Sequence, residues 1–188
     1  MFKGSFYLVL TTAVLVIGYT VAPACATDYV ETSGSILVFS NKYDGKVFTG
    51  TFPGFRTQMS FDPNDLSRAR LDVAIPLTNV HTGDNDRDST LQSADFFNVS
   101  KFATAHYRAD AFRALGNGKY AADGTLELHG MTKPVTLNFT WTPGTQPILI
   151  GKATVNRLDF GIGSGDWADI KIIPNETAIS TKVVFKAK

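Results

Sequence analysis

The chain has 188 residues, which is enough to bury one substantial hydrophobic core. Its 18 lysines and arginines nearly balance its 17 aspartates and glutamates, and no basic stripe runs along it, so nucleic acid is excluded as an expected partner. Aromatic residues make up 12% of the chain, which indicates a large apolar interior, either filled or hollow.

The first 26 residues predict a secretory signal peptide. A small basic start, Met1-Phe2-Lys3, precedes a nearly all-apolar run over residues 6–21, and Ala24-Cys25-Ala26 matches an A-x-A cleavage site. A membrane anchor is the alternative, although the run is slightly short for a span. Cleavage would remove the only cysteine and leave residues 27–188 as one domain, which we expect in the periplasm.

Beyond the signal peptide, apolar residues mostly recur at every second position, which is the period of a strand. Turn dipeptides predict that Pro53-Gly54 joins two strands as a pair and that Gly116-Asn117-Gly118 forms a hairpin turn. One apolar and one polar face per strand favour an antiparallel barrel or sandwich, and periodicity does not separate the two. In chain order, we expect strands over 29–39, 47–52, 55–61, 71–77, 105–115, 120–128, 135–141, 148–160 and 179–185.

Residues 84–102 interrupt this series of strands. Three acidic residues at alternate positions open the segment, and we expect a short helix there, capped by Asp88 or Ser89. Its end carries three phenylalanines within seven residues, whose burial is worth about 1.5–3 kcal/mol each. We therefore predict a lid that docks on the mouth of a β-structure through Phe96, Phe97 and Phe102.

The histidines occur in no recognisable catalytic or metal-binding motif. His129 lies at a hairpin turn, where a structural hydrogen bond is the default, and His106 is expected to face outward from a strand. The glycine-rich run 161–165 lacks the Lys-Ser/Thr of a phosphate-binding loop, so we interpret it as a flexible turn.

The spacing Asp84-x-Asp86-x-Asp88 copies the first ligands of a calcium loop. Ser89 replaces the glycine of that loop, however, and its twelfth position is Asp95, which is too short to act as the usual bidentate glutamate. An acidic, solvated helix start explains the pattern better. We expect no metal site and no catalytic residue.

Three separated blocks of the sequence resemble those of the YceI-like family. Residues 123–135 are similar to its G-x-L-T-L-H-G-V-T-K-P-V hairpin, and residues 156–169 to its N-R-L-D-F-G-I-G-x-G-x-W-A-D block. Thr90 is a departure, since many members carry His there. The signature R-D-x-x-L-x-S-x-D-F-F-x-x-x-K-F is matched by Arg87, Asp88, Leu91, Ser93, Asp95, Phe96, Phe97, Lys101 and Phe102.

The resemblance implies an all-β fold, an eight-stranded antiparallel lipocalin-like barrel with a short helix or loop as its lid. It also implies a secreted, periplasmic protein that holds a long polyisoprenoid, such as a prenyl quinone, for sequestration or transport. No cofactor is expected beyond that bound lipid. An enzyme or a redox accessory that acts on an isoprenoid quinone is the alternative function. A membrane redox protein and a second copy of the chain are the further candidate partners.

The aromatic residues could simply fill a core, but the resemblance implies that part of them lines a pocket. The polar head of the ligand would meet Arg87 or Lys101 at the barrel mouth, unless these residues form a structural ion pair that fixes the lid. The candidate pocket residues are Phe48, Phe52, Phe96, Phe97, Phe102, Phe112, Phe139, Trp141, Phe160, Trp167 and Phe185.

Overall fold

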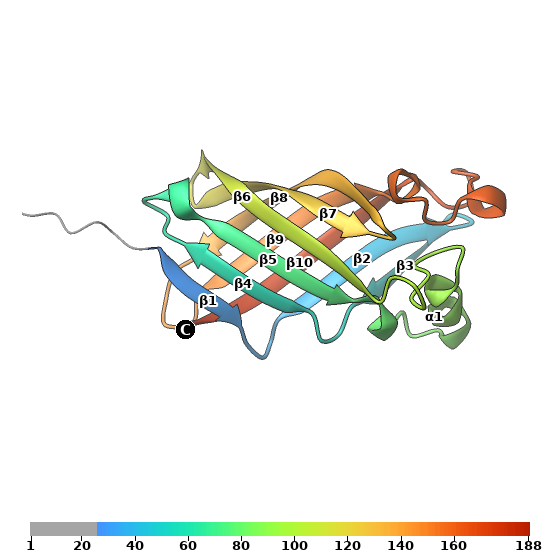
Figure 1. Cartoon of the computed structure of the whole chain (residues 1–188), viewed down its shortest axis with the longest axis horizontal. Coiled ribbons are helices and arrows are strands. Elements are labelled where there is room, and N and C mark those ends of the chain that lie inside the picture. Colours follow the sequence, from blue (N-terminus) through green and yellow to red (C-terminus); the bar gives the residue numbers. More distant parts are fainter. Residues whose placement is uncertain (1–25) are drawn as a thin grey trace, which may run out of the picture.

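The computed structural model describes residues 26–188, so the signal peptide expected over residues 1–26 lies almost wholly outside the described residues (Figure 1). The described part contains ten strands and one short α-helix, α1 (Asn85–Gln92). The strands are β1 (Thr27–Glu31), β2 (Ile36–Tyr43), β3 (Lys46–Thr51), β4 (Arg56–Phe61), β5 (Arg70–Pro76), β6 (Thr104–Gly116), β7 (Lys119–Leu128), β8 (Met131–Thr142), β9 (Ile148–Asn156) and β10 (Glu176–Ala187).

Eight of these strands close into an antiparallel barrel. Hydrogen bonding runs through β1, β4, β5, β6, β7, β8, β9 and β10, and β10 pairs back with β1. Closure pairs the edges that an open sheet would leave exposed. The predicted eight-stranded antiparallel barrel with a short helix is confirmed. The hairpin of β2 and β3 extends the wall at one end, because β2 pairs with β10 beyond β1.

Two predictions for the first strands were wrong. The expected strand over 29–39 is broken at 32–35, where the Ser35 hydroxyl donates a hydrogen bond of 2.8 Å to the carbonyl of Thr32. Pro53-Gly54 does not join a pair, since β3 pairs with β2 and β4 pairs with β1. The hairpin turn is Asp44-Gly45, whose two positive φ angles of 48° and 74° suit the twist of antiparallel strands.

Later elements follow the expected pattern more closely. β6 and β7 pair as a hairpin through Gly116-Asn117-Gly118, as predicted. The strand expected over 148–160 ends earlier, at Asn156, and continues as the short 3₁₀ turn Arg157–Phe160. The expected helix forms, but its N-cap is Asp84, whose carboxylate accepts a hydrogen bond of 3.0 Å from the Arg87 N–H. Asp88 was the wrong cap because an earlier acidic residue already satisfies the first turn.

The two ends of the barrel differ. Figure 1 shows α1, the tip of the β2–β3 hairpin and the segment before β10 gathered at one end, with the C-terminus at the other. At the C-terminal end the interior is filled by aromatic rings, which contact one another at centroid distances from 5.0 Å to 6.2 Å. This aromatic plug consists of Tyr29, Phe61, Phe112, Tyr120, Phe139, Trp141 and Phe185. Among the described residues, no helix has the length and hydropathy to cross a membrane.

Candidate functional site

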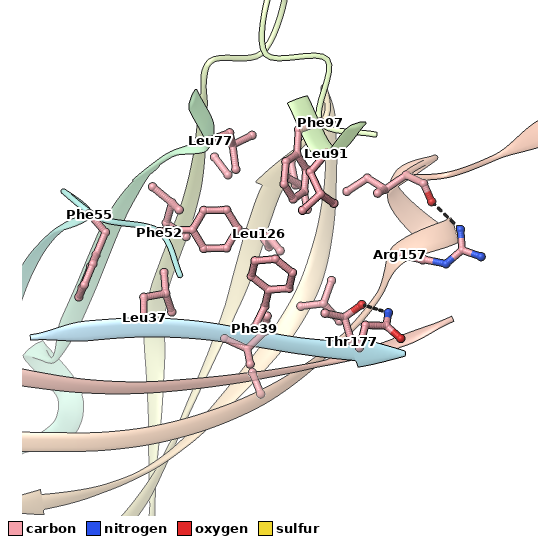
Figure 2. A pocket seen from close by; sticks show the side chains of 18 of the residues that line it. Leu37, Phe39, Phe52, Phe55, Leu77, Leu91, Phe97, Leu126, Arg157 and Thr177 are labelled. Carbon is pink, nitrogen blue, oxygen red and sulfur yellow. Dashed lines mark hydrogen bonds between the residues drawn. The ribbon is translucent and has the colours of Figure 1, made fainter. Parts of the chain in front are cut away.

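The half of the barrel next to α1 contains a cavity of about 470 Å³. Its wall is built mainly from the inward-facing, apolar side chains of the strands. Figure 2 shows the rings of Phe39, Phe52 and Phe97 clustered together in the lining, where the Phe52 ring packs on that of Phe39 with centroids 5.2 Å apart. The volume lies within the range of about 300–1,000 Å³ that is usual for small-molecule sites in proteins. The interior is therefore filled at one end and hollow at the other.

The segment after α1 covers the cavity, as the lid prediction required. Phe96 and Phe97 are only 6% and 7% exposed, and both line the cavity. Phe97 packs on Phe52 with ring centroids 5.9 Å apart, while Phe96 packs edge-on against Trp167 at 5.5 Å. Phe102 lies outside the lining and packs on the ring of His129 at 5.3 Å.

Asp88 fastens α1 to the chain that precedes it. Its carboxylate accepts hydrogen bonds from the N–H of Thr82 at 2.8 Å and from the Thr82 hydroxyl at 2.6 Å, and His81 Nδ1 lies 3.3 Å from it. Burial alone would raise the pKa of Asp88, but the hydrogen bonds from Thr82 and His81 outweigh it and lower the pKa below its ordinary value. We call this group of contacts the Asp88 latch.

Arg87 and Lys101, the expected head-group residues, are placed differently. Arg87 lines the cavity, with its guanidinium 4.9 Å from the ring centroid of Phe48 and 3.2 Å from the carboxylate of Asp84. Lys101 lies outside the lining, and its ammonium is 5.3 Å from the ring centroid of Phe102. The ion pair of Arg87 is therefore made within its own helix turn.

Arg157, which the sequence analysis did not single out, is a buried cation that also lines the cavity. It is only 4% exposed, and burial lowers the pKa of its guanidinium. Its three nitrogens carry five N–H groups. They donate to five main-chain carbonyls, those of Ile162, Gly163, Trp167, Ile173 and Pro174, at 2.5–3.3 Å.

The glycines around Arg157 allow this arrangement. Gly161 and Gly163 have φ angles of 67° and 60°, and a Cβ on Gly163 would lie 2.7 Å from Arg157 Nη1. The expected flexible turn is thus a segment wrapped closely around one cation. Arg157 belongs to the Asn156–Gly163 part of the family signature and shortly precedes the glycine-rich run. This proximity in the sequence was the signal from which Arg157 could have been identified.

The predicted pocket residues divide between the cavity and other parts of the core. The lining includes Phe48, Phe52, Phe96, Phe97 and Trp167. The aromatic plug holds Phe112, Phe139, Trp141 and Phe185, and Phe160 is buried outside the lining at 2% exposure. Whether each ring contacts a ligand stays a prediction. Inward-facing lining residues that the analysis missed, and that strand alternation could have indicated, include Leu37, Phe39, Thr57, Tyr107, Leu126 and Leu137.

A few polar groups also border the cavity. The Tyr107 hydroxyl lies 2.8 Å from the carbonyl of Ala122, to which it donates, and burial raises the pKa of this phenol. Asn41 Nδ2 donates to the Thr177 hydroxyl at 2.8 Å, a contact drawn in Figure 2. Within residues 26–188, no cluster of three or more His, Cys, Asp or Glu residues is arranged to hold a metal ion. His129 Nδ1 lies 2.9 Å from the carbonyl of Phe160, in keeping with the structural role expected for it.

The chain is similar in sequence to proteins of a known family. The family model described as the YceI-like domain matches residues 29–185. A UPF0312 protein of Pseudomonas fluorescens is 34% identical over 170 residues, which cover 80% of this chain and 86% of that protein. A UPF0312 protein of Vibrio campbellii is 30% identical over 164 residues, with 79% and 86% of the two chains covered.

Two solved structures share the fold. BcnA of Burkholderia cenocepacia superposes with a TM-score of 0.77 at 24% identity, covering 80% of this chain and 95% of that one. A domain from Saccharophagus degradans, described as a polyisoprenoid binding domain implicated in plant cell wall breakdown, gives a TM-score of 0.67 at 15% identity. It covers 87% of this chain and 99% of the domain. At these identities the likeness shows the fold alone.

Proposed function

Since the chain belongs to the YceI-like domain family, we propose that it is a lipid-binding protein that holds a long polyisoprenoid, such as a prenyl quinone, inside its barrel. The observation that carries this proposal is the cavity of about 470 Å³, with apolar walls, an aromatic plug as its floor and α1 at its mouth. Burying about 400 Å² of apolar ligand surface would contribute about 10 kcal/mol before the costs of association are subtracted. Binding of this kind requires no catalytic group.

The comparison with the Saccharophagus degradans domain supports the class of ligand, since that domain is described as polyisoprenoid-binding and has the same fold. The chemistry of the wall agrees with it. Aromatic and branched aliphatic side chains, such as Phe52, Phe97 and Leu126, pack well against a chain of methyl branches and double bonds.

Together with the expected signal peptide, this binding mode suggests a periplasmic protein that sequesters a prenyl lipid or carries it between partners. In that role α1 and the following segment act as the gate, because they cover the cavity and the Asp88 latch holds them closed. A membrane redox partner and a homodimer stay predictions.

The proposal is tested by extracting protein purified from its native compartment and analysing the extract and the intact protein by mass spectrometry. We expect about one prenyl lipid per chain. Repeated preparations that are empty, and that show no affinity for added prenyl quinones, would refute the proposal.

A matched pair of variants ties the binding to the cavity. Ala153 lines the cavity, so Ala153→Trp fills it and should abolish lipid binding. Ala111 is exposed on β6, and Ala111→Trp should leave binding unchanged. Equal lipid content in the two variants would place the lipid somewhere other than the cavity.

A further inference from the structure

The cavity ends well before the barrel does. Along β10, the inward-facing Thr181 is partly exposed and lines the cavity, whereas Val183 is 3% exposed and Phe185 is 0% exposed. On β8 the lining stops at Leu137, and the next inward-facing residue is Phe139 of the aromatic plug. The space that a ligand can enter therefore ends at the level of Leu137 and Thr181.

Three side chains close the cavity at this level. Gly151 of β9 lies between Phe139 of β8 and Thr181 of β10 in the register of the sheet. A Cβ on Gly151 would lie 2.9 Å from Leu137 Cδ1, and it would lie 3.2 Å from Leu149 Cδ2 and from Thr181 Cγ2. These separations are too short for ordinary packing, so the three side chains already fill the space over Gly151. We call Leu137, Leu149 and Thr181 the cavity stop.

The cavity stop offers nothing to a polar head group. Two of its side chains are leucines, and the Thr181 hydroxyl already donates to the carbonyl of Ile36 at 2.9 Å. Charged residues of the described lining belong instead to α1 and its N-cap at the mouth, namely Asp84, Asp86 and Arg87. The remaining one, Arg157, has no donor left, because all five N–H groups donate to main-chain carbonyls. A head group at the stop would lose its hydration without gaining a partner, so the apolar chain end is the part that fits there.

The closed cavity sets an upper limit to the length of chain that it encloses. Its volume of about 470 Å³ is typical of sites for drug-sized ligands, so only part of a polyisoprenoid with many units fits inside. A unit beyond the enclosed length is left in water at the mouth. In a membrane or a micelle the same unit is surrounded by apolar chains, and its exposure to water is unfavourable in proportion to its apolar area.

We propose that the cavity stop selects ligands by the length of their isoprenoid chain. The ligand enters with its chain end first, until that end meets Leu137, Leu149 and Thr181, and its head group stays at the mouth. Chains up to the enclosed length are taken up, whereas longer chains are rejected because their excess units would lie in water. This inference rests on the proposed function and adds to it a limit on chain length.

The test is a competition among prenyl quinones that differ only in the number of isoprene units and are presented together in detergent micelles. Native mass spectrometry shows which lengths the parent protein has bound. We expect uptake up to a cut-off length and a fall of at least about tenfold for the first unit beyond it. Bound quinones that simply match the composition of the micelles would overturn the proposal. If no quinone of any length binds, the proposed function itself fails, which is a distinct result.

Two variants of Leu137 move the stop in opposite directions. Leu137→Ala opens space toward Phe139, so the first length that the parent rejects should bind at least about tenfold more tightly. Leu137→Phe fills space above the stop and should shift the cut-off to shorter chains.

Val80 provides the control for a weakened core. It is 4% exposed and lies outside the cavity lining, so Val80→Ala removes buried apolar atoms without changing the stop and should keep the cut-off of the parent. The proposal is overturned if the cut-off is unchanged in the Leu137 variants that fold, or if Val80→Ala shifts it as far as Leu137→Ala does.

Discussion

Arg157 Nη2 donates a hydrogen bond of 2.8 Å to the main-chain carbonyl of Trp167, so a buried cation positions a residue whose ring lines the cavity. The same guanidinium holds four more carbonyls of the segment between β9 and β10. One side chain thus orders much of the barrel mouth.

Replacing Arg157 should therefore be costly. Arg157→Met leaves five main-chain carbonyls without their donor, and we expect a loss of about 3–5 kcal/mol in the free energy of unfolding, measured in urea. Arg56 provides the control, since its side chain is 73% exposed in a pair with Glu31, and Arg56→Met should cost about 1 kcal/mol or less. Equal losses in the two variants would show that the carbonyl contacts contribute little.

The Asp88 latch should control ligand exchange. Asp88→Ala removes the acceptor of both Thr82 hydrogen bonds, and charge-assisted bonds of this kind are worth about 1.5–3 kcal/mol each. We expect lipid release, followed by stopped-flow fluorescence, to become at least about tenfold faster, with a smaller effect on overall stability. Asn85→Ala removes an exposed polar side chain from the same helix turn and changes neither the latch nor the cavity lining. Release as slow in Asp88→Ala as in Asn85→Ala would contradict the gating role.

Phe61 and Phe52 should respond differently to truncation. Phe61 is 1% exposed and contacts four aromatic rings in the plug, so Phe61→Ala should lower the free energy of unfolding by about 3–5 kcal/mol. Phe52 borders the existing cavity, so its ring has packing partners on fewer sides. Phe52→Ala should therefore lower the free energy of unfolding by less than Phe61→Ala does. Lipid affinity should change in Phe52→Ala and not in Phe61→Ala. A larger loss in the free energy of unfolding for Phe52→Ala than for Phe61→Ala would argue against a tightly packed aromatic plug.

Acid should weaken the contact between β6, β7 and β8. Hydrogen bonds from Arg113 and then from Thr136 lower the pKa of Asp123 to about 2, from an ordinary value of 3.8. Because the folded-state pKa is depressed, the stabilisation is present above pH 3.8 and is lost as the pH falls toward 2. Melting temperatures measured from pH 5 to pH 2 should fall less steeply in Asp123→Asn than in the parent. If the melting temperatures of the two proteins fell in parallel with pH, the Asp123 carboxylate would not contribute to the acid dependence of stability. The size of the effect is small, because both side chains are partly exposed.

Local chemistry explains which predictions succeeded. Apolar residues at every second position placed β5, β7 and β8 within a few residues, since a half-buried strand requires that pattern. The pairing of β3 and β4 was mistaken because Pro53-Gly54 and Asp44-Gly45 are both turn dipeptides. The pairing of β3 with β2 and of β4 with β1 makes Asp44-Gly45 the hairpin turn, and this pairing depends on tertiary structure.

What the sequence determined by itself was the alternation of strands, the interrupting helical segment and the burial of Phe96 and Phe97, because these depend on side chains within a few residues of one another. The tertiary structure alone decided which rings fill the barrel and which border the cavity. Phe52 and Phe61 are both buried, and they differ only in how many distant strands bring rings against them.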